Sequence, residues 1–295
     1  MAIFVFSPRY YSDVGEHVLQ TGKYRETYKK LLREGGVAPE DVVEPSPAAD
    51  EEVLLVHTPR YLEDLRGCRH TARTWTSELP ITREIVEAYF LATGGTVLAA
   101  EKALQAGRAL NLTGGFHHCF PERAEGFCYL NDLAVAVRAL QKRGRIRRAA
   151  VIDCDLHQGN GTAFIFRDDP TVFTFSIHQE NLYPVKRQSD LDVGLEDFAG
   201  DDVYLPLIER HVPRILDEHK PELVICQAGV DPYEGDQLGS LRLTEEGLRR
   251  RDRFVVGECA RRGIPIAGTL GGGYAFREED TVRLHFNTCM AFREG

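Results

Sequence analysis

Short apolar segments alternate with longer helical patterns along most of this chain. A strand with one face in solvent alternates apolar and polar residues, whereas a strand of a parallel sheet covered on both faces is apolar throughout. The segments that we predict to be strands are residues 108–113, 149–154, 171–177, 222–228 and 264–270. Because helical patterns separate them, we predict an α/β fold with a parallel central sheet and helices on both faces.

Residues that favour helix starts mark several of the helices. Thr58 precedes a proline, and Thr82 and Thr244 each precede a helical pattern, so all three are predicted N-caps. We expect Pro206 and Pro213 to interrupt a helix that contains them. The predicted helices are residues 83–105, 131–143, 202–219, 245–262 and 280–292, with a further helix that begins at Pro59.

The chain shows no convincing domain boundary. It has no internal repeat, low-complexity tract or long linker, and 295 residues are a common size for a single α/β unit. The segment Pro39 to Glu52 is rich in proline, alanine and acidic residues, and we expect it to be a surface loop. We therefore predict a single domain over residues 1–295.

Charge and cysteine content argue against several classes of protein. The formal net charge is −9 at pH 7, whereas nucleic-acid binders usually carry a basic surplus. The N-terminal apolar run from Ala2 to Phe6 is too short for a signal peptide, and no segment approaches the ~18 apolar residues of a membrane span. We expect neither a nucleic-acid nor a membrane partner. Seven widely spaced cysteines without a C-x-x-C pair indicate reduced thiols and a cytoplasmic protein.

Polar residues or glycines follow each predicted strand at its carboxyl end. In parallel α/β sheets, ligands bind beyond these ends. The segments that follow the five strands are residues 114–118, 153–157, 176–178, 229–231 and 271–274. A single such coincidence means little, but five together are best explained by a common site.

The run Asp153, Asp155, His157 suggests a metal site. In extended geometry the three side chains leave the backbone on one side, and buried titratable groups are costly unless something neutralises them. Two carboxylates and an imidazole match a catalytic zinc site that keeps one position open. Asp155 and His157 are candidate ligands, Asp231 at another strand end is the best third, and Asp153 would orient a histidine. The alternative is a helix N-cap cluster or an ion-pair site.

Two further features carry candidate chemistry. His117 and His118 follow two glycines at a strand end, and the pair could supply a general base and an electrostatic partner near a metal-bound water. Adjacent histidines in a surface loop are otherwise usually incidental. Tyr274 ends a run of three glycines, and its hydroxyl could stabilise an oxyanion. The alternative is a packed tyrosine after a turn.

Taken together, six motifs resemble those of the histone deacetylase family in their order and approximate spacing. They are GGFHHC, EGFCYLND, DCDLHQGNGT, FSIH, AGVDPYEGD and LGGGY. The resemblance spans about residues 9–274 and is greatest to class IV and related bacterial deacetylases. It implies the arginase/deacetylase fold and an enzyme that removes acyl groups from N-acyl-lysine side chains of peptides or proteins.

The resemblance also implies a role for each candidate residue. The zinc ligands would be Asp155, His157 and Asp231. His118 would act as general base and then general acid, with electrostatic help from His117 and its partner Asp153. Tyr274 would polarise the scissile carbonyl. The acyl-lysine channel would be lined by Gly126, Phe127 and Tyr183. A structural potassium ion would lie near Asp153, Asp155, His157, Ser176 and Ile177.

One departure from the family pattern concerns His118. Many class I members have His and Asp at the positions of Gln158 and Asn160. A neutral amide beside His118 stabilises the imidazolium less than a carboxylate would, so we expect His118 to be neutral at rest. This state favours its action as a base.

The residues leave other functions open. The same site could belong to an amidohydrolase for acetylpolyamines or small metabolites, whose substrate is a small acylated amine. A catalytically silent acyl-lysine-binding scaffold is a third possibility, although the complete ligand set and Tyr274 argue against it. Carboxylate-rich sites also suit Fe²⁺ or Co²⁺, so zinc rests on the resemblance and on the ligand count.

Overall fold

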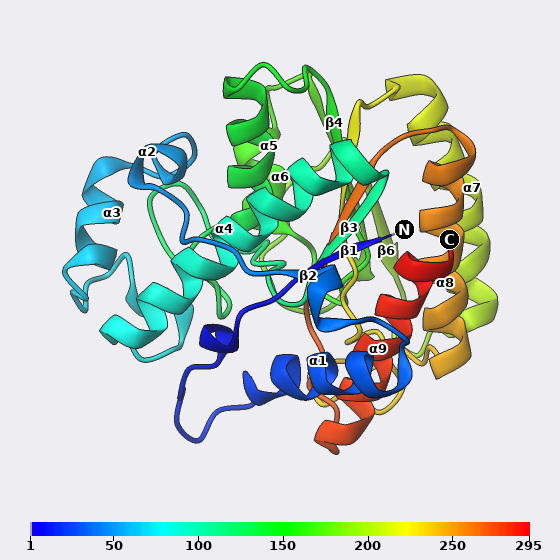
Figure 1. The fold of residues 1–295 in the computed structure, drawn as a ribbon, viewed down its shortest axis with the longest axis horizontal. Coiled ribbons are helices and arrows are strands. Elements are labelled where there is room, and N and C mark those ends of the chain that lie inside the picture. The colour runs from blue at the N-terminus through cyan, green and yellow to red at the C-terminus, as the bar shows by residue number, and fades with distance from the viewer. Residues whose placement is uncertain (1) are drawn as a thin grey trace.

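A computed structural model describes residues 2–295. Its centre is an eight-stranded sheet in the order β2-β1-β3-β8-β7-β4-β5-β6, in which all neighbouring strands are parallel (Figure 1). The strands are β1 (Ile3–Val5), β2 (Val42–Val43), β3 (Arg108–Asn111), β4 (Ala149–Asp153), β5 (Val172–Gln179), β6 (Leu191–Leu195), β7 (Leu223–Gln227) and β8 (Ile266–Thr269).

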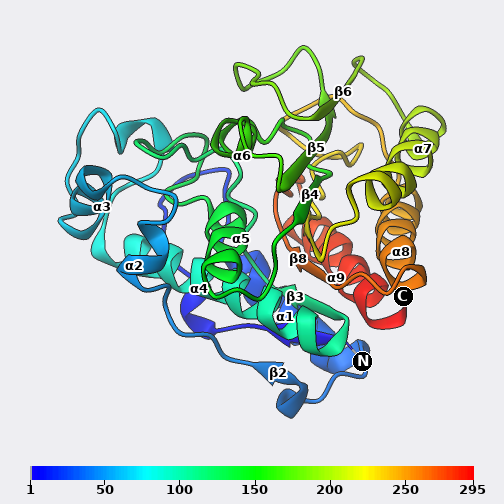
Figure 2. The same ribbon diagram turned by 90° about the horizontal axis from the view of Figure 1, so that it is seen from above.

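Helices cover both faces of the sheet, as predicted. The α-helices of residues 2–295 are α1 (Gly22–Glu34), α2 (Asp50–Val53), α3 (Pro59–Arg66), α4 (Arg83–Ala106), α5 (Asp132–Lys142), α6 (Asn160–Phe166), α7 (Asp201–His219), α8 (Glu245–Arg261) and α9 (Glu278–Glu294). Figure 2 shows α4 and α5 on one side of the strands and α7 and α8 on the other.

The strand residues divide between two cores. Along β4, Ala150 and Ile152 pack into a core that includes side chains of α1, α7, α8 and α9. Ala149 and Val151 pack into a second core with α4 and α5. This alternation explains why the strand is apolar at every position. The expected doubly covered parallel sheet is confirmed.

A third apolar cluster lies beside the sheet, around α2, α3 and the first turns of α4 (Figure 1). Leu62 and Leu65 of α3 pack there with Phe90 of α4. Cys128 and Leu130 join the same cluster from the segment before α5. The cluster therefore anchors a loop that reaches the carboxyl ends of the strands.

The expected interruption of the helix over 202–219 is wrong. Helix α7 continues through Pro206 and Pro213. Each proline removes one backbone hydrogen bond. The buried face that includes Tyr204, Ile208 and Val212 nevertheless continues across both prolines, and tertiary packing of such a face contributes most of the stability of a helix in a protein.

The segment Pro39 to Glu52 is not simply a surface loop. It contains a 3-10 turn (Pro39–Asp41), strand β2 and the start of α2. Strand β2 pairs in parallel with β1, with Val42 opposite Phe4. Both strands are too short to show a periodic pattern, and their pairing joins residues distant in sequence.

Three longer elements were also not anticipated from the sequence: α1, α6 and β6. Strand β6 lies at the sheet edge and alternates partly buried and exposed residues over most of its length. Among residues 2–295, no helix has the length and apolar character needed to cross a membrane.

Candidate active site

Two strand ends bring three predicted metal ligands together. Asp155 and His157 follow β4, and Asp231 follows the neighbouring β7. The His157 Nδ1 atom lies 3.3 Å from Asp155 Oδ1 and 3.4 Å from Asp231 Oδ2. One nitrogen or oxygen atom from each residue lies within 4.8 Å of the others, and all three residues are buried. The group could hold a metal ion.

In both Asp155 and Asp231, the carboxylate oxygen that does not face His157 accepts a hydrogen bond from the protein. Asp231 Oδ1 accepts a hydrogen bond from the Leu156 backbone N–H at 3.0 Å, and Asp155 Oδ2 accepts one from Gln227 Nε2 at 3.1 Å. Asp231 Oδ2, which faces His157, has no hydrogen-bond partner within residues 2–295. A buried carboxylate oxygen without a donor is costly, and a cation would satisfy it.

The electrostatics of the three groups also suit a cation. Burial, with the nearby charge of Asp231, raises the pKa of Asp155 to about 6. Burial alone would lower the pKa of His157, but the nearby Asp155 and Asp231 carboxylates outweigh this effect and raise it to about 10. The site thus favours bound protons, and a divalent ion would replace them.

The two adjacent histidines have different partners. His117 Nδ1 lies 2.7 Å from Asp153 Oδ2, the expected carboxylate, whereas His118 Nδ1 lies 2.9 Å from Asn160 Oδ1. Burial would lower the pKa of His117, but the charges of Asp153 and Asp155 raise it to about 9. Burial, together with positive charge on neighbouring histidines, lowers the pKa of His118 well below 6.5. The latter direction agrees with a neutral His118 at rest.

Tyr274 is held from two sides. Its backbone N–H donates to Asp236 Oδ2 at 2.7 Å. Lys23 Nζ donates to the carbonyls of Gly272 and Gly273, at 2.6 and 2.9 Å, and lies 4.7 Å from the centre of the Tyr274 ring. Burial raises the pKa of the Tyr274 hydroxyl well above 10, so this hydroxyl is a hydrogen-bond donor at neutral pH.

The glycine run is required by a close approach. Gly272 has φ +59°, and a Cβ atom there would lie 2.5 Å from the Asp231 carboxylate. Only glycine meets both conditions at low cost. The turn that carries Tyr274 therefore packs directly against the proposed ligand Asp231.

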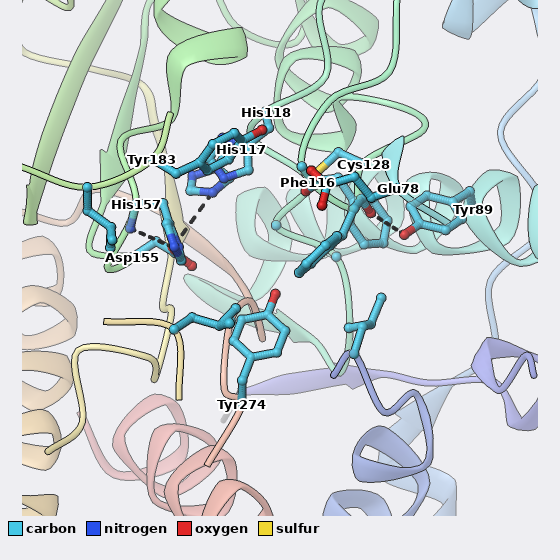
Figure 3. A pocket seen from close by; sticks show the side chains of 18 of the residues that line it. Glu78, Tyr89, Phe116, His117, His118, Cys128, Asp155, His157, Tyr183 and Tyr274 are labelled. Atoms are coloured by element: carbon cyan, nitrogen blue, oxygen red, sulfur yellow. Dashed lines mark hydrogen bonds and ion pairs between the residues drawn. The ribbon is translucent and has the colours of Figure 1, made fainter. Parts of the chain in front are cut away.

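A pocket opens above these groups. It is lined by Leu19, Tyr24, Glu78, Tyr89, Gly114, Gly115, Phe116, His117, His118, Gly126, Phe127, Cys128, Asp155, His157, Leu182, Tyr183, Leu238, Gly272 and Tyr274. In Figure 3 the two histidines, Tyr183 and His157 gather on one side, and the Tyr274 hydroxyl points into the cavity from below. The pocket includes the three predicted channel residues, Gly126, Phe127 and Tyr183.

Two residues of the predicted potassium group, Asp155 and His157, line the pocket formed by residues 2–295, whereas Asp153, Ser176 and Ile177 do not. Asp153 at the end of β4 pairs in register with Ser176 of β5, next to the buried Ile177. Ser176 Oγ lies 2.9 Å from His178 Nδ1.

Two residues that support the site, Gln227 and Lys23, were not predicted from the sequence. Gln227 Nε2 bonds Asp155 and the Gly115 carbonyl, and its Oε1 accepts from Thr269. A lone polar residue at the end of a fully buried strand could have indicated this role. Lys23 is 1% exposed, and a lysine on the buried face of an amphipathic helix was the corresponding indication.

Comparisons with known proteins all point to one family. The histone deacetylase domain family matches residues 17–289. An uncharacterized protein of Picosynechococcus sp. is 43% identical over 286 residues, which cover 95% of each chain. Histone deacetylase 2 of Arabidopsis thaliana is 32% identical over 270 residues, which cover 88% of this chain and 70% of that protein.

A solved structure shares the whole fold. The crystal structure of an HDAC homolog complexed with SAHA has a TM-score of 0.85 and 25% identity, and the match covers 100% of this chain and 84% of that chain. The family match, the relatives and the shared fold all agree with the resemblance noted in the motifs. The chain belongs to the histone deacetylase family and is a hydrolase of that family.

Proposed function

We propose that the chain is a zinc-dependent deacylase that hydrolyses the side-chain amide of N-acyl-lysine in peptides or proteins. The observation that carries this proposal is the buried Asp155–His157–Asp231 group beside a pocket lined by His118 and Tyr274. The family membership supports a deacetylase-type reaction on an acylated amine.

The donor set fits a divalent metal. Two carboxylates and one imidazole nitrogen would hold the ion, and the unbonded Asp231 Oδ2 is available to it. When bound, such an ion lowers the pKa of water and polarises a carbonyl oxygen. We propose zinc, because three protein ligands leave a position open. Fe²⁺ and Co²⁺ suit the same donors.

The two histidines would divide the proton chemistry. His118 Nδ1 is turned to Asn160, which leaves Nε2 to take a proton from water and later to protonate the leaving amine. His117, bonded to Asp153, would stabilise negative charge nearby. Apolar walls at Phe127 and Tyr183 suit the methylene stem of a lysine side chain.

Tyr274 would donate its hydroxyl hydrogen to the substrate carbonyl oxygen as negative charge develops there. We expect Tyr274→Phe to lower kcat by on the order of 10² to 10³, with a small change in KM, because the contact strengthens in the transition state. Steady-state kinetics on an acetyl-lysine peptide measure this effect. A near-normal kcat would rule out this role for Tyr274.

Gln227 should tune metal affinity through Asp155. Gln227→Met removes the donor to Asp155 Oδ2, and we expect metal affinity to fall about 10-fold to 100-fold. Competition with a chelator measures this affinity. Gln141→Met is a matched control, because Gln141 bonds Arg138, the Arg147 carbonyl and Thr171 and does not line the pocket. Equal affinity in wild type and Q227M would contradict the proposed support of Asp155.

Small acylated amines are the second candidate substrates. Glu78 lines the pocket and is exposed. A carboxylate at this position favours a substrate with an additional amine, such as an acetylpolyamine. Acyl-lysine peptides remain the primary proposal because the family relatives include a named histone deacetylase.

A substrate panel decides between these candidates. Acyl-lysine peptides from acetyl to long-chain groups are compared with acetylpolyamines on one preparation of known metal content. We expect the higher kcat/KM on an acyl-lysine peptide. A preference for acetylpolyamines would favour the second candidate, and no metal-dependent turnover of any substrate would favour a silent binding scaffold.

Two further assignments remain proposals. A structural potassium ion would lie near Asp153, Asp155, His157, Ser176 and Ile177. At this place β4 ends beside the neighbouring strand β5. A cytoplasmic location is supported by seven cysteines that form no disulfide among residues 2–295.

A further inference from the structure

Asn160 is bonded at both ends of its side-chain amide. Its Oδ1 lies 2.9 Å from His118 Nδ1 and accepts the Gly161 backbone N–H at 3.0 Å. Its Nδ2 donates to Glu125 Oε1 at 2.7 Å. Asn160 is 1% exposed, so water does not compete for these bonds. A continuous chain of hydrogen bonds thus runs from Glu125 through Asn160 to His118.

The partners of Asn160 fix which way its amide points. A backbone N–H can only donate, so the atom beside Gly161 is the oxygen. A carboxylate at neutral pH only accepts, so the atom beside Glu125 is the NH₂ group. The amide oxygen therefore faces His118, and Nδ1 of His118 must be the donor in that bond. The other ring nitrogen, Nε2, is left without a proton when the imidazole is neutral.

Glu125 is itself held in place. Its side chain is 16% exposed, and Arg123 Nη2 lies 2.9 Å from Oε2, the oxygen that Asn160 does not use. Backbone bonds in both directions join Glu125 to Cys128. The next residue, Gly126, has φ +50°, and a Cβ atom there would lie 2.6 Å from the His118 ring. The turn that carries Glu125 therefore packs against the base.

We propose that Glu125 is a positioning residue for His118. By accepting from Asn160, it keeps the amide oxygen turned to His118, so that the neutral imidazole carries its proton on Nδ1 and presents Nε2 to the pocket. The proposal rests on the proposed function of His118 as base. It gives a role to Glu125, to which the family resemblance assigns none. It also explains why a buried amide can serve as the orienting partner of a base.

The sharpest variant is Glu125→Gln, which keeps the size of the side chain. Arg123 selects the oxygen of the new amide, so the NH₂ group turns to Asn160 and opposes its Nδ2. Asn160 then keeps the Gly161 N–H contact that favours its present orientation but loses the one to Glu125, so molecules that present its NH₂ group to His118, with the imidazole proton on Nε2, become populated. We expect kcat on an acetyl-lysine peptide to fall by about 10-fold, with KM nearly unchanged.

Two readouts separate positioning from a structural effect. Nitrogen-15 and carbon-13 shifts of the His118 ring, assigned by difference from a His118→Ala sample, report the tautomer in the zinc-loaded protein. We expect the Nδ1–H form in wild type and a shift toward Nε2–H in E125Q. The double variant R123A/E125Q should return toward wild type in tautomer and kcat, because the new amide is then free to turn its oxygen to Asn160.

Glu122→Gln is the matched control. Glu122 also pairs with Arg123 but forms no bond to Asn160, so its tautomer and kcat should match wild type. The proposal is overturned if E125Q keeps the wild-type tautomer and kcat, or if its loss is not reversed in R123A/E125Q. The spectra need no substrate. They therefore test the hydrogen-bond chain from Glu125 to His118 even if wild-type protein proves unable to hydrolyse acyl-lysine.

Discussion

Asp231→Ala should leave the protein unable to retain its metal and should lower acyl-lysine turnover by on the order of 10³ or more. Asp231 supplies one of three proposed ligand side chains, and its Oδ2 atom has no other partner within residues 2–295. Metal content after dialysis and kcat/KM on an acetyl-lysine peptide measure the two effects.

Thermal unfolding gives an independent measurement of the same variant. A ligand that binds only the folded state at about 100 times its Kd adds about 2.7 kcal/mol of stability, which raises Tm by roughly 5 °C. We expect added zinc to produce such a shift in wild type and none in D231A. Removal of Asp231 also relieves repulsion with Asp155, so metal-free D231A should fold.

Asp64→Asn is the control for burial of an aspartate. Asp64 of α3 is 2% exposed, and its side chain contacts Arg69, Arg73 and Thr71, none of which lines the pocket. The variant should bind zinc like wild type. Full metal occupancy in D231A would refute the assignment of Asp231 as a ligand.

His118→Ala is the prediction with the next largest effect. We expect kcat to fall by about 10² to 10⁴, the usual contribution of a positioned general acid or base, while the bound metal is retained. Retained metal distinguishes this variant from D231A. Added imidazole should restore part of the rate, because the deleted ring leaves space beside the pocket.

The control for this variant is His70→Ala. His70 is exposed and packs on Trp75 away from the pocket, so its removal should leave kcat unchanged. A His118→Ala protein that binds metal and turns over substrate at the wild-type rate would show that another group acts as the base.

The strands that position the site were predictable because they are buried on both faces. Strand β4 is apolar through Ile152 and then presents Asp153, Asp155 and His157, so the change from apolar to polar residues marks the sheet edge. The same change from apolar to polar residues follows β7, and it placed Asp231 near Asp155 and His157. Parallel pairing of β4 with β7 then brings these ends together.

The supporting contacts were less predictable because they depend on distant parts of the chain. Lys23 meets Gly272 across 249 positions, and Gln227 meets Gly115 across 112. Periodicity does not report such pairings. Glu125 stands in a motif of the family resemblance, yet its bond to Asn160 depends on the orientation of a turn. Local patterns therefore located the candidate reacting groups and Asp153, but not the contacts made by Lys23, Gln227 and Glu125.

Titration of zinc into metal-stripped protein shows whether the chain is a metal-dependent deacylase. Bound metal and hydrolysis of an acetyl-lysine peptide are measured on the same sample. We expect the rate to rise in proportion to bound zinc, to reach its limit at a single ion per chain, and to stay at background in D231A. Full hydrolysis by metal-stripped protein, or a fully loaded protein that hydrolyses no acyl-lysine peptide, would contradict this function.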